Sequence, residues 1–220
     1  MHEYPIEELA NDIAACSSPE EFDTVGQATL RYFDQITERA HVRVDCREGC
    51  SLCCRSLRVD VFAHEVFLIA HYIRDHFTSE EMSELRLRLA EHSSKVAPLT
   101  PFEHATRNLP CPLLRDGRCS VYSARPHSCR RHHSTDVAAC QFTFDHPTNL
   151  ESPAAHDRDL FKELTGAMRG NIEAYRALVF DGTIYELGTA LDEALADPSC
   201  WQHWREHEEA FVRASVTPPG

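Results

Sequence analysis

The chain has 220 residues, 42% of them hydrophobic, and a formal net charge of −13. This length predicts one domain, or one domain with a helical extension, whose apolar content is sufficient for a core without disulfides. The net negative charge argues against nucleic acid and anionic membranes as partners.

Helical patterns flank an irregular central segment. Ser18 and Glu21 are spaced as in a capping box at a helix start, and Thr78 and Glu81 repeat this signal. Residues 96–135 contain several prolines and no long periodic run, so we expect loops and turns there. Helices are predicted over residues 17–40, 57–77, 78–95, 152–180, 183–196 and 198–214.

The predicted fold class is mainly α, a helical protein with an irregular, turn-rich cysteine cluster at its centre. One small hairpin is expected within this centre, where Asp116–Gly117 supplies the turn. We divide the chain into an N-terminal helical segment (1–40), a cysteine-cluster metal-binding domain (41–145) and a C-terminal helical segment packed on it (146–220).

Ten cysteines are distributed unevenly along the chain. Cys16 and Cys200 lie in predicted terminal helices without thiol neighbours, and we expect them to be buried as small hydrophobic residues. The other eight gather between residues 46 and 140 and are predicted metal ligands: Cys46, Cys50, Cys53, Cys54, Cys111, Cys119, Cys129 and Cys140.

The spacing of these eight cysteines is typical of metal ligands. Two or three intervening residues, as in the segment CREGCSLCC, allow a short loop to direct two sulfurs to one ion. The adjacent Cys53 and Cys54 point in different directions, so they could serve two metals, or one could ligate while the other supports it. A turn at 116–117 would bring Cys111 and Cys119 to one side of a hairpin.

Arginine is concentrated in the same two segments. Residues 107–133 carry six arginines and one acid, and residues 46–58 carry three arginines and one acid. These segments therefore hold charges of +5 and +2, while the rest of the chain holds −20. Cations near a thiol lower its pKa and favour the thiolate, so this pattern is expected around ligands and not around inert core cysteines.

The start of the sequence bears on the redox state of these thiols. MHEYPIEELANDIAAC places acids where a secretion signal needs basic residues before an apolar run, and the longest apolar run, VFLIA at 66–70, is too short to span a bilayer. We therefore expect a soluble, cytoplasmic protein in which clustered cysteines stay reduced and act as ligands. Disulfides are the alternative, and they require an oxidising compartment.

The combined pattern resembles a known family. CREGCSLCC, the V…HE start of the next helix, and CPLL…GRCSVYSARPHSCR together resemble the YkgJ family, also described as the CxxCxxCC zinc- or iron-chelating domain, over roughly residues 40–145. One detail departs: three residues, not two, separate Cys46 and Cys50, with Gly49 before the second. The resemblance implies metal chelation by the eight cysteines. It also provides two leads, iron–sulfur oxidoreductases and flagellin lysine methylases with a related motif.

The spacing leaves both zinc and an iron–sulfur cluster open as the cofactor. Eight thiolates could form two closed zinc sites, and a 4Fe–4S cluster also takes four thiolates. The spacing of Cys46, Cys50 and Cys53 also occurs in radical-SAM enzymes, but the strand–helix repeats of a barrel are missing. We find no phosphate-binding glycine loop and no serine nucleophile elbow, so the sequence leaves open whether the protein is an enzyme.

Three functions are compatible with these observations. The first is a metal-binding protein in which the metal orders the centre, the second an iron–sulfur oxidoreductase or methyl-transfer enzyme, and the third a metal-stabilised module for an unidentified protein partner. His132, His133 and Asp136 are candidates for extra ligands, supporting groups or proton carriers. Glu65 is expected either to orient a ligand or to be solvated.

Overall fold

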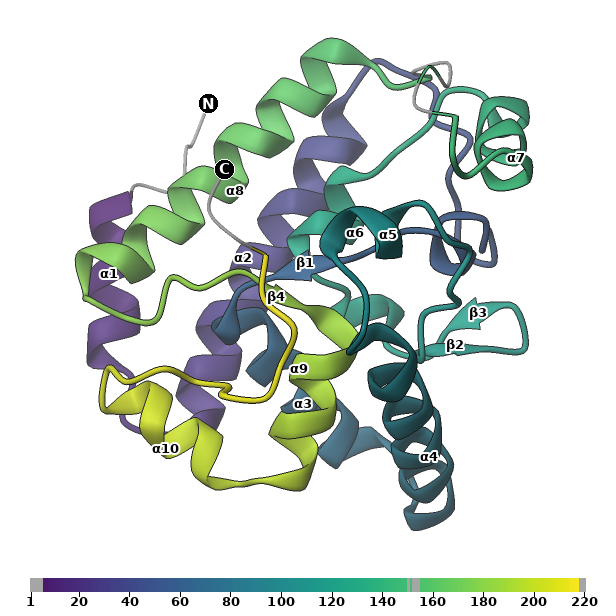
Figure 1. Cartoon of the computed structure of the whole chain (residues 1–220). Coiled ribbons are helices and arrows are strands. Elements are labelled where there is room, and N and C mark those ends of the chain that lie inside the picture. Colours follow the sequence, from purple (N-terminus) through teal and green to yellow (C-terminus); the bar gives the residue numbers. More distant parts are fainter. Residues whose placement is uncertain (1–5, 150, 152–154, 218–220) are drawn as a thin grey trace.

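A computed structural model of the chain describes residues 6–149, 151 and 155–217. These residues are mainly helical with little strand, which confirms the predicted fold class (Figure 1). The helices are α1 (Ile6–Ala15), α2 (Pro19–Arg39), α3 (Ala63–His76), α4 (Ser79–Val96), α5 (Pro101–Ala105), α6 (His127–Arg131), α7 (Val137–Asp145), α8 (Arg158–Ala177), α9 (Leu187–Ala196) and α10 (Ser199–Arg205), with 3-10 turns η1 (Cys53–Arg55) and η2 (Tyr122–Ala124). The strands are β1 (Asp60–Val61), β2 (Leu114–Arg115), β3 (Arg118–Cys119) and β4 (Tyr185–Glu186).

The predicted caps begin two of the long helices. The hydroxyl of Ser18 accepts the backbone N–H of Glu21 at the start of α2 (3.3 Å). Thr78 and Glu81 form the complete capping box at the start of α4, with hydrogen bonds of 3.2 and 3.0 Å. The box in α2 is incomplete, because the carboxylate of Glu21 accepts the N–H of Ser17 and not that of Ser18.

Three other helices are shorter than predicted. Helix α3 begins at Ala63, because the residues before it form strand β1 and its approach. Helix α8 begins at Arg158, where the carboxylate of Asp157 caps it; residues 152–154 of the predicted helix lie outside the described residues. Helix α10 ends at Arg205, well before the predicted end.

The prediction of loops and turns throughout residues 96–135 is wrong in two places. Helices α5 and α6 both lie in this segment. Thr100 and Glu103 form a capping box at the start of α5 (3.2 and 2.9 Å). Each helix has five residues, which is too short to produce a readable helical period.

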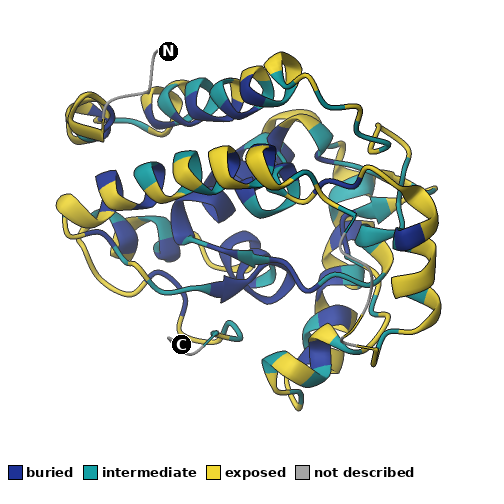
Figure 2. Ribbon diagram, turned by 90° about the horizontal axis from the view of Figure 1, so that it is seen from above, coloured by how far each residue is buried: buried dark blue, intermediate teal, exposed yellow. Residues whose placement is uncertain are grey.

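Helix α3 lies at the centre of the fold and carries the functional region on its N-terminal end. Ten of its fourteen residues are buried, and it packs against α2 and α9. Strands β1 and β4 are antiparallel, so the starts of α3 and α9 are joined at one point. Buried residues concentrate on these inner elements, while the outer helix faces are exposed (Figure 2).

One apolar core unites distant parts of the chain. A single cluster of buried residues runs from Leu9 in α1 to Phe211 after α10, and a smaller cluster joins Phe33 of α2 to Leu164 of α8. All three predicted segments contribute side chains to this core, while the boundaries drawn between them stay a prediction. Within the part of the chain that the structure describes, no helix combines the length and apolarity needed to cross a bilayer.

Candidate metal centre

The first cysteine group lies on a turn followed by η1. Gly49 has φ +87°, a conformation that favours glycine, and Cys50 donates its N–H to the carbonyl of Arg47 (3.0 Å). The extra residue between Cys46 and Cys50 is thus accommodated by a glycine turn. The sulfur of Cys46 accepts the N–H of Ser134 (3.1 Å), which ties this group to the end of the second cysteine segment.

The predicted hairpin is present and positions two thiols. Strands β2 and β3 are antiparallel, with Leu114 opposite Cys119. Asp116 and Gly117 have φ values of 50° and 75°, as a two-residue turn of this kind requires. Cys111, just before the hairpin, donates its N–H to the carbonyl of Cys54 (2.8 Å), so the backbone joins the two cysteine segments directly.

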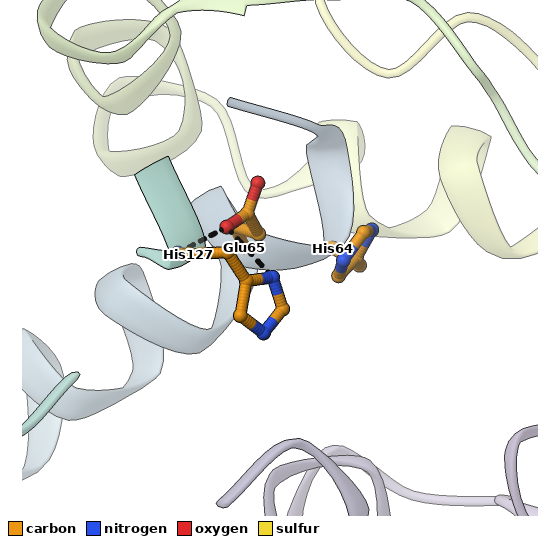
Figure 3. A group of neighbouring side chains, drawn as sticks. All are labelled: His64, Glu65 and His127. Carbon is orange, nitrogen blue, oxygen red and sulfur yellow. Dashed lines mark hydrogen bonds and ion pairs between the residues drawn. The ribbon is translucent and has the colours of Figure 1, made fainter. Parts of the chain in front are cut away.

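Helix α6 carries Cys129 and is held by α3 through Glu65. This carboxylate is 3% exposed; it accepts the N–H of His127 (2.7 Å) at the start of α6 and the N–H of Phe62 (3.0 Å) (Figure 3). Burial alone would raise the pKa of Glu65, but His127 beside it and its hydrogen-bond donors lower the pKa to about 2. Glu65 is therefore not solvated, and it positions the helix that carries Cys129.

The inner thiols interact with one another across the two segments. Burial raises the pKa of Cys129 well above its ordinary value, and the thiols of Cys111, Cys53 and Cys119 raise it further. Burial also raises the pKa of Cys111 to about 12, and Cys119 and Cys53 again contribute. We call Cys53, Cys111, Cys119 and Cys129, whose thiols raise one another's pKa, the inner group.

The outer thiols lie around Cys46. Burial raises the pKa of Cys46, the N–H of Ser134 lowers it, and the thiols of Cys53, Cys140 and Cys50 raise it. Cys140 comes from α7, which packs against η1. We call Cys46, Cys50 and Cys140 the outer group, and Cys53 interacts with both groups.

Cys54 lies at the junction of the two groups. A hydrogen bond between the side chains of Cys53 and Cys54 is the largest cause of the raised pKa of Cys53, followed by burial. All ten cysteines are free, so none of the eight central sulfurs is used in a disulfide. Among the described residues no three of these sulfurs lie within 4.8 Å of one another, so the contacts join the two cysteine segments without forming a closed ligand set.

The arginines near the thiols mostly bind other groups. Arg130 donates to the carbonyls of Ser123 (2.6 Å) and Arg125 (2.9 Å) and pairs with Asp34. Arg58 donates to Asp60 (3.0 Å). The expectation that arginine lowers the thiol pKa values is therefore wrong for most of the group, because burial outweighs it. The pKa is raised for Cys46, Cys53, Cys111, Cys119 and Cys129, and Arg125 opposes this only at Cys119.

Two of the predicted auxiliary residues have structural partners. The Nδ1 of His133 lies 3.0 Å from the carbonyl of Arg131, and its Nε2 accepts the N–H of Asp157 (3.1 Å). Both nitrogens are therefore in use, and the ring joins α6 to the start of α8. Asp136 caps α7 by accepting the N–H of Ala138 (2.8 Å).

The third auxiliary residue, His132, lines a cavity beside the outer group. Burial lowers its pKa, so the ring tends to stay neutral. The cavity has a volume of about 250 Å³, and Cys53, Cys140 and His156 also line it. A small molecule in this cavity would lie against sulfurs of the cysteine centre.

The two remaining cysteines are buried, as predicted, but only Cys200 lies in a helix, because α1 ends at Ala15. Cys16 at the end of α1 is 6% exposed and donates to the carbonyl of Asp12 (3.2 Å), and Cys200 in α10 is 4% exposed. Burial raises the pKa of both thiols. Neither belongs to the inner or the outer group.

The donor set of the centre fits a thiophilic metal. The thiols of the two segments raise one another's pKa, and a thiol that binds a metal loses its proton even where its pKa is high. The sulfur of Cys46 accepts the N–H of Ser134, and this hydrogen bond would be stronger for a thiolate than for a thiol. Buried thiols without a metal would instead stay protonated.

Sequence comparison identifies the domain that contains this centre. Residues 45–152 match the family model CxxCxxCC, whose description is "Putative zinc- or iron-chelating domain". No curated protein and no solved structure matches the chain. The matched range begins just before Cys46 and extends past α7, so it includes all eight central cysteines. Residues 45–152 of the chain therefore form a domain of the CxxCxxCC family, for which YkgJ is another name.

Proposed function

We propose that the protein chelates zinc or an iron–sulfur cluster through the eight central cysteines. The observation that carries this proposal is that the two separate cysteine segments meet: Cys111 donates its N–H to the carbonyl of Cys54 (2.8 Å), and the sulfur of Cys46 accepts the N–H of Ser134 (3.1 Å). Four thiolates are the complete ligand set of a structural zinc ion and of a 4Fe–4S cluster. The inner group would hold one such centre.

The outer group would hold a second metal. Cys46, Cys50 and Cys140 supply three sulfurs, and Cys54, adjacent to a member of the inner group, supplies the fourth. In this assignment Cys53 binds the inner metal and the adjacent Cys54 binds the outer one. It is supported by the interactions of Cys46 with Cys50 and Cys140.

Serine substitutions test this division. We expect Cys129→Ser to remove the inner metal. We also expect it to lower the yield of folded protein, because Cys129 is half-buried and packs against the main apolar core. We expect Cys140→Ser to remove the outer metal and leave the inner one. The measurement is the number of metal ions per chain in anaerobically purified protein, determined by elemental analysis.

Cys16→Ser is the matched control, because this thiol is buried but lies outside both groups. It should leave the metal content unchanged. Equal metal content in the wild type and Cys129→Ser would contradict the inner site, and equal content in the wild type and Cys140→Ser would contradict the outer one.

A second candidate function is an iron–sulfur oxidoreductase or methyl-transfer enzyme. The cavity of about 250 Å³ beside Cys53 and Cys140 favours it, because a substrate bound there would touch the cysteine centre. Neutral His132 in the wall could accept a proton. A brown protein with an iron–sulfur absorption band supports this candidate, and a colourless protein with stoichiometric zinc contradicts it.

A further inference from the structure

A second set of metal-binding side chains lies outside the cysteines, where α3 meets α6. His64 and Glu65 of α3 and His127 of α6 each offer a nitrogen or oxygen atom, and these atoms lie within 4.8 Å of one another. All three side chains are buried, and Figure 3 shows the carboxylate of Glu65 joined to His127 by dashed lines, with the ring of His64 to one side.

Unpaired polar atoms concentrate at this point. Among the described residues, four buried side-chain nitrogen or oxygen atoms have no hydrogen-bond partner, and three of them are Nδ1 and Nε2 of His127 and Nδ2 of Asn171. The Nδ1 of His127 is 3.1 Å from Oε1 of Glu65, near enough for an ion pair, but it does not meet the geometry of a hydrogen bond. Because a buried imidazole without partners is costly, an occupant for this site is expected.

His64 is arranged as a metal-ligating histidine would be. Its Nε2 lies 2.8 Å from Oδ1 of Asn171; since the amide oxygen only accepts, Nε2 carries the proton and Nδ1 keeps a free lone pair. The ring also stacks on Tyr175 at 3.9 Å between centroids, and His127 stacks on Phe33 at 4.3 Å, so both imidazoles are held in place.

We propose that His64, Glu65 and His127 bind one divalent cation, zinc or ferrous iron, at a site separate from the cysteine centre. Two imidazoles and one carboxylate are a ligand set that both ions accept, with positions left for water. The negative charge of Glu65 offsets part of the charge of the cation. The proposal does not depend on a metal at the cysteines.

A groove lies next to this site. It has a volume of about 690 Å³ and lies between α1, α2 and α8. Asn171 and Phe33 are part of its lining, and these two residues hold the imidazoles of His64 and His127. The groove therefore reaches two residues that contact the proposed ligands directly.

A similar buried cluster elsewhere lacks these properties and supplies the control. His92, His104 and Glu186 also lie within 4.8 Å of one another. The guanidinium of Arg58, however, lies 3.3 Å from Nδ1 of His104, and Nε2 of His92 lies 3.0 Å from Glu186. The arginine takes a lone pair that a metal would need and adds a positive charge, so we expect no cation there.

His127→Phe distinguishes a site that binds metal from one that is empty, because the expected change in melting temperature has the opposite sign in the two cases. Phenylalanine keeps the stacking on Phe33, and the backbone N–H of residue 127 still reaches Glu65. If the site binds metal, the variant loses one zinc ion per chain and the rise in melting temperature that added zinc gives the wild type. If the site is empty, removing unpaired atoms leaves the metal content unchanged and raises the melting temperature, which would overturn the proposal.

Cobalt substitution separates this site from the cysteines. In His127→Phe and in Glu65→Gln, which keeps a side-chain oxygen, the thiolate-to-cobalt charge-transfer absorption should persist while one cobalt ion per chain is lost. His92→Gln, the matched control in the second cluster, should keep the full metal content.

X-ray absorption at the zinc edge of the wild type provides a measurement that needs no variant. We expect nitrogen or oxygen neighbours at about 2.0–2.1 Å, in addition to any sulfur at about 2.3 Å. A spectrum that contains sulfur neighbours alone would overturn the proposal even if every variant failed to fold.

Discussion

Glu186 is a buried carboxylate whose ionised form stabilises the fold. It is 3% exposed, accepts the N–H of Thr189 (2.8 Å) at the start of α9, and lies 3.0 Å from Nε2 of His92. Burial would raise its pKa, but His92 and the N–H donors lower it from 4.5 to about 2. The pKa in the folded state is therefore below the pKa in the unfolded state.

This difference predicts a specific loss of stability in acid. A depressed carboxyl pKa contributes stability that is present above the unfolded value of 4.5 and is lost as the pH falls toward about 2. In Glu186→Gln, the free energy of unfolding should be lower at neutral pH by roughly 1.5–3 kcal/mol, as for other hydrogen bonds to charged groups. Its decline between pH 4.5 and 2 should be shallower than in the wild type. Denaturant titrations at several pH values measure both.

The control for this prediction is the exposed pair of Glu91 and Lys95 on α4. Glu91→Gln should leave the neutral and acid values unchanged, because surface pairs contribute little. If Glu186→Gln followed the wild-type pH profile, the buried pair would have no role in acid stability.

At the scale of elements, the backbone conformation of the hairpin turn predicts how a glycine-to-alanine substitution changes stability. Gly117 has φ +75°, and a Cβ there would be strained although no atom lies within 4 Å. Gly117→Ala should therefore destabilise the hairpin that carries Cys119, by about 1–2 kcal/mol. Gly166 in the middle of α8 also has open space but no positive φ, so Gly166→Ala should stabilise by roughly 0.5–1 kcal/mol. Thermal unfolding of the two variants should give shifts of opposite sign.

The hairpin and the two cap signals could be predicted because their information is local. Asp116–Gly117 between two short strands, and Thr78 with Glu81 before a periodic run, each specify a structure within a few residues. Strands β1 and β4 could not be predicted, because two-residue strands have no period and pair across most of the chain. Helix α7 was missed as well, and its Asp136 cap was interpreted as a possible ligand.

In the candidate sites, too, local signals could be predicted from the sequence and long-range contacts could not. The cysteine spacing predicted that these thiols act together, which stays a prediction, but it did not indicate that burial would raise their pKa values against the arginines. The motif V…HE drew attention to Glu65, yet its partner His127 is 62 positions away. Pairing of that kind depends on how α3 and α6 meet, which no local pattern encodes. The cluster of His64, Glu65 and His127 therefore emerged only from the fold.

At the scale of the whole molecule, the core is largely independent of the cysteine centre. The main cluster is built from α1, α3, α4, α9 and α10, while the cysteine segments contribute a minority of its buried residues. Removing metal should therefore loosen residues 46–57 and 105–145 but leave the long helices folded. We expect a chelator to reduce far-ultraviolet circular dichroism only slightly and to speed amide exchange mainly in those two segments. A collapse of the whole helical signal would contradict this prediction.

The pairing of β1 with β4 has a consequence for biosynthesis. Asp60 acquires its strand partner Glu186 only after more than four fifths of the chain has been synthesised, and Arg58 then also reaches Thr217 (2.9 Å). The eight central cysteines are therefore synthesised before strand β4, which pairs with β1, exists. A metal ion delivered to these sulfurs during translation would meet a chain that has not yet folded. We therefore expect the protein to bind its metal after release from the ribosome, and reducing conditions to matter most before that release.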